Sequence, residues 1–292
     1  MSELKFGVTL PQFSADPDVF WDGVRRAEAA DLDSIWLFDH LWPLSGGKNR
    51  PILESWTTLA QIAARTERVA VGTLVTRSAL RHPALLARMA ATASLVAGGR
   101  LIIAIGSGDA KSREENDAFG IPYFGPDDRV DQLAGTVDIV RRHLEGVRFE
   151  HRDRFAAVAE LPASPGRRCP VWVGGRSAGA LEVAGRLADG WNSWASTSAQ
   201  FGRDAATVID AAGGRGVELS WGGIVIIGRT DDDAAAKAAG RGEGRLVGGP
   251  ATVSSRLDEL IDAGARHLIA TLPDAGIPGS YELFAEAAGR GR

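Results

Sequence analysis

The sequence predicts an α/β protein folded as a (β/α)8 TIM barrel with short insertions, and three observations lead to that class. Short apolar segments without polar alternation recur along the 292 residues, as is typical of parallel strands covered on both faces. Amphipathic segments lie between them, and parallel strands need such crossover connections. Eight units of this kind close a barrel, so we expect residues 1–292 to form a single barrel domain.

The strand-like segments come at regular intervals and are counted first. In chain order they are residues 5–10, 34–38, 69–75, 101–105, 171–173, 191–194, 219–227 and 267–271. The helical segments are residues 18–30, 54–65, 83–97, 129–144, 178–187, 198–212, 231–239 and 252–263. We count these as eight strands and eight helices in strict alternation.

Two helical segments show best why this assignment follows from the residues. Segment 83–97 begins with proline, which is favoured in a first helical turn because its missing N–H needs no partner there. Its apolar residues then recur at three- and four-residue steps. Segment 252–263 places Val253 and Leu260 on one face, and Gly264 follows where a C-cap glycine is expected. Both segments are therefore expected to cover the barrel from outside.

Two stretches interrupt the regular succession of strand and helix segments, and one other fold class is possible. Residues 145–168 indicate a short β excursion before the fifth strand, and residues 240–249 are irregular. A doubly wound open sheet is the alternative architecture. Its dinucleotide-binding members carry Gly-x-Gly-x-x-Gly after the first strand, whereas this chain has "TLPQFS" there. The barrel is therefore preferred.

The composition limits the kinds of molecule that the protein can bind and the cell compartment in which it is expected. The net charge is −4 and the pI is near 5.8, which argues against non-specific binding of nucleic acid or anionic membranes. No apolar run is long enough to span a bilayer, and no basic segment precedes an apolar one at the start. We expect a cytoplasmic protein. The single cysteine, Cys169, excludes an internal disulfide and a cysteine-rich metal cluster, and we expect it to be structural.

In a (β/α)8 barrel the chemistry sits where strands end, so the residues that follow each strand are the candidates. After the second strand come Asp39, His40 and Trp42. "TRSALRHP" follows the third strand, "GSGDAKS" the fourth and "GGRSAG" the fifth. The last two are glycine-rich turns at or near helix starts.

These two glycine turns allow two interpretations. Exposed backbone N–H groups and a helix dipole suit a phosphate, and Arg176 could add a charge-assisted contact. Alternatively, the glycines serve only tight turns between strand and helix. Two such turns on neighbouring strands favour a phosphate site more than one would. Phosphate binding and a purely structural role of the glycines both stay open.

The pair Asp39-His40 also has several interpretations. Metal-dependent barrel hydrolases need further histidines on other strands, and among the remaining ones only His82 is expected near the catalytic face. We therefore expect no metal site. A general base oriented by a neighbouring acid and a structural histidine are the two other interpretations of His40.

At this point the sequence resembles a known family. "SIWLFDHL", "VAVGTLVTRSALRHPALLARMAATASLVAGGRLIIAIGSG" and "PVWVGGRSAGALEVAGRLADGWN", in this order, resemble the bacterial luciferase-like flavin and deazaflavin oxidoreductases. "LVGGPATVSSRLDELIDAGARHLIA" resembles the family's last helix and strand. The Asp-His pair with an acid after Gly-x-Gly resembles the branch that uses the deazaflavin coenzyme F420. Asp109 is shorter than that branch's glutamate and Trp42 is out of register with its tryptophan, so the resemblance predicts the cofactor and not a substrate.

The resemblance implies roles for individual residues. It implies a non-proline cis peptide in the third strand, which we expect at Thr73–Leu74, under the central ring of the cofactor. His40, Asp109 and Trp42 are the implied catalytic residues: proton acceptor, partner of the N1 edge of the ring, and wall of the substrate pocket. The implied cofactor contacts are Asp39, Thr73, Leu74, Thr76, Ser107, Gly108, Gly174, Gly175 and Arg176.

Three functions therefore stay open. The first is an F420-dependent oxidoreductase acting on a small organic substrate. The second is an FMN-dependent monooxygenase of the same family, supplied with reduced flavin by a separate reductase. The third is a non-catalytic barrel that binds a ligand or serves as a subunit. The resemblance also implies a homodimer.

Overall fold

The computed structural model describes residues 3–14, 16–44, 47–162, 169–241 and 244–290. Eight parallel strands close into a barrel in the order β9-β11-β1-β2-β3-β4-β7-β8, and β8 pairs with β9. These strands are β1 (Lys5–Thr9), β2 (Ser34–Leu37), β3 (Ala70–Arg77), β4 (Leu101–Gly106), β7 (Val171–Gly174), β8 (Gly190–Trp194), β9 (Glu218–Ile227) and β11 (His267–Thr271). The predicted fold class and all eight predicted strands are confirmed.

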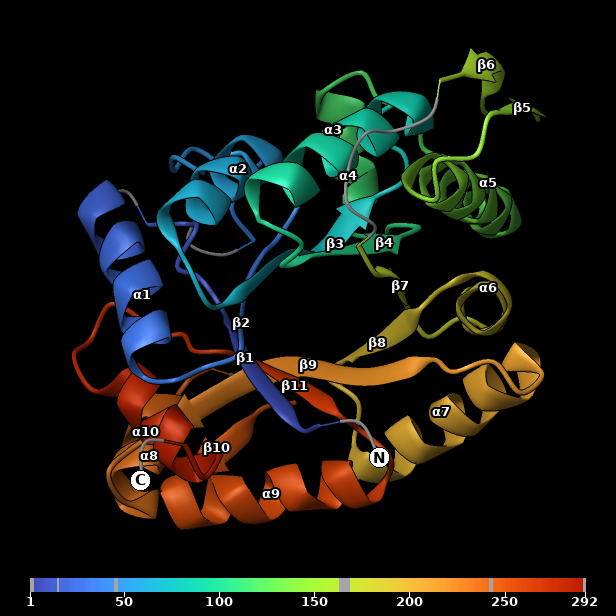
Figure 1. Ribbon diagram of the computed structural model, residues 1–292. Coiled ribbons are helices and arrows are strands. Elements are labelled where there is room, and N and C mark those ends of the chain that lie inside the picture. The colour runs from blue at the N-terminus through green and yellow to red at the C-terminus, as the bar shows by residue number, and fades with distance from the viewer. Residues whose placement is uncertain (1–2, 15, 45–46, 163–168, 242–243, 291–292) are drawn as a thin grey trace.

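The helices lie outside the strands (Figure 1). They are α1 (Pro17–Ala29), α2 (Ser55–Arg65), α3 (Pro83–Val96), α4 (Ser112–Ala118), α5 (Pro126–Leu144), α6 (Ala178–Leu187), α7 (Ser198–Ala212), α8 (Asp231–Ala238), α9 (Pro250–Asp262) and α10 (Ser280–Ala287). All eight predicted helices are present among these. The predicted strict alternation is wrong. Both α4 and α5 lie between β4 and β7, both α8 and α9 lie between β9 and β11, and α10 follows the last strand.

The two helices that the sequence did not reveal are short. α4 has seven residues, SREENDA, with no apolar periodicity, and α10 has only eight. A helix of two turns offers too few repeats for a 3.6-residue pattern to stand out. α4 matters most, because it carries residues of the site.

The predicted β excursion is an antiparallel hairpin of β5 (Phe149–Arg152) and β6 (Ala157–Leu161), which lies beside α5 (Figure 1). Residues 163–168 of that stretch lie outside the described residues. In the irregular stretch 240–249, β10 (Leu246–Gly248) pairs with the end of β9. Residues 242–243 are also outside the described part.

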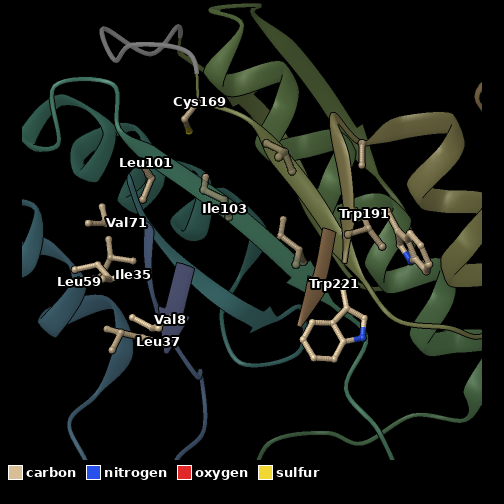
Figure 2. Packing of buried hydrophobic residues seen from close by; sticks show 14 of the residues in the cluster. Val8, Ile35, Leu37, Leu59, Val71, Leu101, Ile103, Cys169, Trp191 and Trp221 are labelled. Carbon is tan, nitrogen blue, oxygen red and sulfur yellow. The ribbon is translucent and has the colours of Figure 1, made fainter. Parts of the chain in front are cut away.

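The core has two layers. Aliphatic side chains such as Val8, Ile35 and Leu59 fill the space between sheet and helices (Figure 2). Inside the barrel the rings of Trp36 and Trp172 lie with centroids 5.4 Å apart. Glycines in the strands make room for them. A Cβ on Gly72 would lie 2.5 Å from Trp36, and one on Gly190 would lie 2.5 Å from Trp172. The barrel interior is thus a packed core and not a channel.

Cys169 gives a pH-dependent prediction. It is 1% exposed, and burial raises the pKa of its thiol to about 12. Because the thiolate is the reactive form, the native protein should not react with Ellman's reagent at about pH 8, and one thiol should react after unfolding in guanidinium. Thiol titration in the two buffers measures this. Rapid reaction of the native protein would contradict the structural role of Cys169.

Candidate active site

The carboxyl ends of β2, β3, β4 and β7 form one continuous part of the barrel rim. The register pairs Arg77 of β3 with Gly106 of β4, and Gly106 with Gly174 of β7. The turn after β2 lies beside this row, because β2 pairs with β3. Residues that the sequence predicted at separate strand ends therefore lie on the same rim, as expected for a barrel enzyme.

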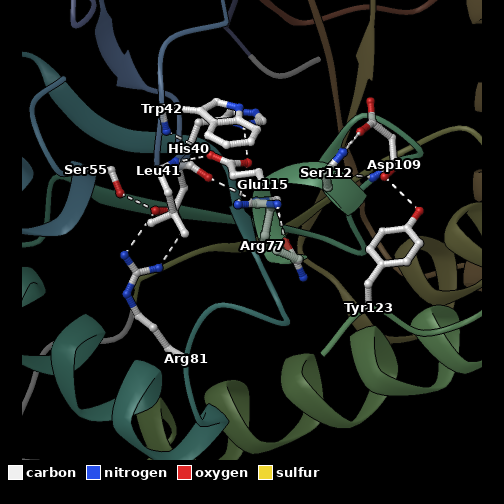
Figure 3. Close-up of polar contacts among 12 residues, drawn as sticks. His40, Leu41, Trp42, Ser55, Arg77, Arg81, Asp109, Ser112, Glu115 and Tyr123 are labelled. Carbon is white, nitrogen blue, oxygen red and sulfur yellow. Dashed lines mark hydrogen bonds and ion pairs between the residues drawn. The ribbon is translucent and has the colours of Figure 1, made fainter. Parts of the chain in front are cut away.

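Asp39 is buried there, and its carboxylate is held by the protein itself. It is 1% exposed and accepts hydrogen bonds from Arg81 at 2.6 and 3.1 Å and from the Ser55 hydroxyl at 2.6 Å (Figure 3). Burial opposes the charge of Arg81, but the contacts with Asp39 and Glu54 outweigh it and raise the pKa of the guanidinium. Asp39 therefore fixes the turn after β2, and its predicted contact with a cofactor stays a prediction.

Next to it, His40 is anchored on one ring nitrogen. Its Nδ1 lies 3.0 Å from Oε2 of Glu115, a residue of α4 that is 1% exposed (Figure 3). The His40 side chain is 20% exposed, and among the described residues no protein group bonds to its Nε2. One nitrogen is thus engaged by a buried acid, and the other is left for a ligand.

Glu115 has three further contacts, all with donors. Its Oε1 accepts the backbone N–H groups of Leu41 and Trp42, the latter at 3.1 Å. The Arg77 guanidinium lies 2.7 Å from its Oε2. We call Glu115 and these four donors, from His40, Leu41, Trp42 and Arg77, the Glu115 clamp. Burial raises the pKa of Glu115, but the contact with His40, then the Leu41 N–H and the Arg77 charge, outweigh it, so that the pKa lies below its usual range.

Arg77 connects this clamp to the rest of the turn. It is 4% exposed and donates from Nε to the carbonyl of Asp39 at 3.3 Å and from a terminal nitrogen to Asn116 at 2.8 Å. Burial lowers the pKa of the guanidinium, whereas the charge of Glu115 raises it. An arginine stays charged in such a site, so Glu115 has a permanent positive neighbour.

Little in the sequence pointed to Glu115. It lies 75 residues after His40, and its neighbours in α4 form no motif. The only signal was its place in the segment that follows β4, since all residues after barrel strands are candidates. The acid expected after Gly-x-Gly was instead Asp109.

Asp109 is exposed, and its carboxylate accepts from the backbone N–H and the hydroxyl of Ser112, both at 3.1 Å. These contacts lie at the start of α4, on the side away from His40 (Figure 3). Trp42 lies closer to His40, with Lys48 Nζ 4.4 Å from its ring centroid. The structure therefore brings His40 and Trp42 together and leaves Asp109 apart from them.

The third strand carries the expected irregularity one residue later than predicted. The cis peptide bond is Leu74–Val75 and not Thr73–Leu74. The pairing of β3 with β4 shifts register between Thr73 and Thr76, whose hydroxyls are 2.8 Å apart. The sequence located the bulge but could not fix the bond, because every residue from 73 to 76 fits a buried strand equally well. Leu74 is 5% exposed and faces the barrel core cluster.

One predicted phosphate-binding glycine, Gly174, has a steric role, as does Gly106 beside it in the sheet. A Cβ on Gly174 would lie 2.5 Å from the side chain of Val75, and one on Gly106 would also overlap it. Val75 therefore inserts between β4 and β7. The tight-turn interpretation of these glycines is supported in this respect, and it does not exclude a ligand above them.

The turn after β7 has features that favour an anion. Gly175 has a φ of +140°, and the Ser177 side chain caps α6 by accepting from the Ala180 N–H. The Arg176 guanidinium is 37% exposed and donates from Nε to Asp204 at 2.9 Å. The turn after β4 is more closed. Ser107 and Gly108 border a gap of about 10 Å³, which has room for no more than a water molecule.

A larger cavity lies between the turn after β2 and α4. Its volume is about 380 Å³, and His40, Trp42, Lys48, Lys111 and Glu115 are among its lining residues. Such a volume is in the range of small-molecule sites.

In the described part of the chain, no group of three or more His, Cys, Asp or Glu side chains could hold a metal ion. Within the same residues, no helix is long and apolar enough to cross a membrane.

These features define a class: a (β/α)8 barrel with a bulged third strand and an acid–imidazole pair at its carboxyl rim. Comparison with known proteins gives the family. The model of the luciferase-like monooxygenase family matches residues 4–246, and the chain belongs to this family.

Individual relatives are distant. The chain is 29% identical over 192 residues to an F420-dependent glucose-6-phosphate dehydrogenase of Microbacterium testaceum (strain StLB037), covering 64% of this chain and 56% of that protein. It is 29% identical over 244 residues to a phthiodiolone/phenolphthiodiolone dimycocerosates ketoreductase of Mycobacterium sp. (strain JLS), covering 71% and 60%. The chain thus spans less than two thirds of the length of these relatives. A solved F420-dependent secondary alcohol dehydrogenase in complex with an F420-acetone adduct has a TM-score of 0.84 at 17% identity and 98% coverage of both chains, which shows the shared fold.

Proposed function

We propose that this protein is an F420-dependent oxidoreductase that moves a hydride between the deazaflavin and a small organic alcohol or carbonyl compound. The observation that carries this proposal is His40, which has Nδ1 held by buried Glu115 and is one of the residues that line a cavity of about 380 Å³. A histidine so placed can exchange a proton with a hydroxyl or carbonyl oxygen. The F420-dependent relatives support the choice of cofactor.

The residues at the rim fit such a cofactor chemically. The partly exposed Trp194 offers apolar surface at the end of β8, and Gly222 lies against it and against buried Leu74 without a side chain between them. The turn at Gly174, Gly175 and Arg176 offers backbone N–H groups and a cation for a phosphate. Because the gap beside Ser107 and Gly108 holds only a water molecule, the phosphate would contact the outer face of that turn.

The deazaflavin supplies the hydride chemistry when it is bound, and the chain supplies orientation and a proton. His40 accepts a hydroxyl proton at Nε2 during oxidation and returns it to a carbonyl oxygen during reduction. Trp42 walls the cavity beside it. The barrel rim beneath the proposed cofactor is supported by Asp39, Thr73 and Thr76. Trp56 donates to the Thr76 hydroxyl at 3.0 Å and so fixes the bulge of β3. Asp109 remains proposed as a contact of the ring edge.

An FMN-dependent monooxygenase is the second candidate, and the family's own name favours it. It differs in needing oxygen and a supply of reduced flavin from a separate reductase. The partly exposed indole of Trp194 can support either tricyclic ring. We place F420 first because relatives named for F420 match over most of the chain.

Cofactor binding tests this proposal directly. Oxidised F420 and FMN are titrated separately into the purified protein, and the fluorescence of each is followed. We expect F420 to bind at micromolar concentration and FMN to bind at least about tenfold more weakly, a difference of about 1.4 kcal/mol. Tighter binding of FMN would favour the monooxygenase. Binding of neither would revive a non-catalytic ligand-binding barrel.

We also propose that the protein acts as a homodimer in the cytoplasm. The homodimer is inferred from the family resemblance, and a measurement of the molar mass in solution tests it. Loss of the dimer on dilution without loss of F420 binding would separate assembly from the site.

A further inference from the structure

Glu115 is as deeply buried as Asp39, and the role proposed for His40 does not by itself explain why an acid is buried there. It is 1% exposed, lies on the short helix α4 and has four donors around its two oxygens. A buried carboxylate is costly unless it is paired. Here Oε1 accepts two backbone N–H groups, and Oε2 lies at hydrogen-bond distance from His40 and forms an ion pair with Arg77. The Glu115 clamp is therefore held together by three hydrogen bonds and one ion pair within the protein.

The clamp fixes the protonation pattern of His40. Glu115 is ionised, because its contacts hold its pKa below the usual range, so it can only accept hydrogen bonds. The His40 Nδ1 that lies 3.0 Å from it must then carry a proton. In the neutral imidazole the other nitrogen, Nε2, is left as an acceptor.

Resting on the function proposed above, we infer that Glu115 is a positioning residue that holds neutral His40 as the Nδ1–H tautomer, with Nε2 ready to accept a proton from substrate. Arg77 and the backbone N–H groups of Leu41 and Trp42 keep the Glu115 carboxylate oriented for this task. The proton moves between the substrate oxygen and Nε2 only, and Glu115 itself exchanges none.

The variant Glu115→Gln tests the inference, because it changes one oxygen into an amide nitrogen. The N–H groups of Leu41 and Trp42 are fixed by the turn and need the remaining oxygen. The contact of Arg77 with Glu115 is an ion pair and not a hydrogen bond, and the hydrogen bonds of Arg77 go to the Asp39 carbonyl and to Asn116. The amide NH2 would then face His40 Nδ1 and require it to become an acceptor, so that the proton moves to Nε2.

Nitrogen-15 NMR of the histidine side chains reads the tautomer without any cofactor or substrate. The chain has five histidines, so the signals can be assigned by single substitutions. At about pH 9, where histidine side chains are neutral, we expect Nδ1–H for His40 in the native protein and Nε2–H in Glu115→Gln. An Nε2–H tautomer in the native protein would overturn the inference, and this measurement does not depend on the variant's folding.

Kinetics supply the second arm. With F420 and an accepted substrate, Glu115→Gln should lower the single-turnover rate about 10²–10⁴-fold while KM changes little, as expected when a base is held in the wrong tautomer. A changed tautomer at the native rate would overturn the inference. A lost rate with an unchanged tautomer would overturn it too.

A matched control exists in the same chain. Glu218 lies 3.4 Å from Nδ1 of fully buried His267, near the amino-terminal ends of β9 and β11. Glu218→Gln should alter the NMR signals of His267 and leave the rate unchanged. Native protein that shows Nδ1–H at His40 but no F420 binding would support the role of Glu115 while the proposed function fails.

Discussion

Replacement of His40 by alanine is expected to lower the rate of the chemical step about 10²–10⁴-fold, because the substrate oxygen then loses its proton acceptor. F420 binding should stay within about threefold of the native value, since no cofactor contact is proposed for the imidazole. The measurement is a single-turnover experiment on pre-bound F420, followed by the absorbance change of the deazaflavin, with small organic alcohols as first substrates.

Two outcomes would tell against this expectation. An unchanged single-turnover rate would remove His40 from proton transfer. A large loss of F420 affinity would place the imidazole against the cofactor instead. His82 provides the control, because it caps α3 by accepting from the Ala84 N–H at 3.3 Å and lies outside the proposed machinery. His82→Asn keeps a capping acceptor and should leave the rate unchanged.

Arg81→Met is expected to give the largest loss of stability, about 3–5 kcal/mol in the free energy of unfolding. The carboxylate of Asp39 is 1% exposed, and without Arg81 it would keep only the Ser55 hydroxyl as a side-chain donor. An uncompensated buried charge is far more costly than a missing surface pair. Urea denaturation at neutral pH measures the change.

The controls for Arg81→Met are a surface pair and a double variant. Arg186→Met removes the exposed contact with Glu182 and should cost no more than about 1 kcal/mol. Adding Asp39→Asn to Arg81→Met should recover part of the stability, because the buried charge is then gone. A loss below about 1 kcal/mol for Arg81→Met would mean that Asp39 is solvated or protonated in the native protein.

The barrel could be predicted from the sequence because its strands are buried on both faces and its longer helices repeat their apolar residues often enough. Segment 219–227, for example, is apolar except for Ser220 and became β9 with an error of one residue. α4 and α10 were missed, since so few turns carry no readable period. The strand β10 was also missed, because its three residues carry no recognisable pattern.

The site was predictable only in part. Asp39, His40 and Trp42 could be placed at the rim because the rule for barrel strands assigns strand ends to chemistry. Their partners could not, because Arg81 and Glu115 reach them across 42 and 75 residues, and such contacts follow from the closed sheet and not from local spacing. The acid after the fourth strand was expected at Asp109, where the structure shows a carboxylate that accepts hydrogen bonds from Ser112, the first residue of α4.

The insertion of Val75 between Gly106 and Gly174 has a consequence for protein engineering. A designer who wishes to reshape the loops above β4 and β7 cannot vary the two glycines one at a time, since a methyl group at either meets the same valine. In a variant library that keeps Val75, variants with a larger residue at position 106 or 174 are expected not to fold correctly. A library that also replaces Val75 with a smaller residue would allow both loops to be redesigned.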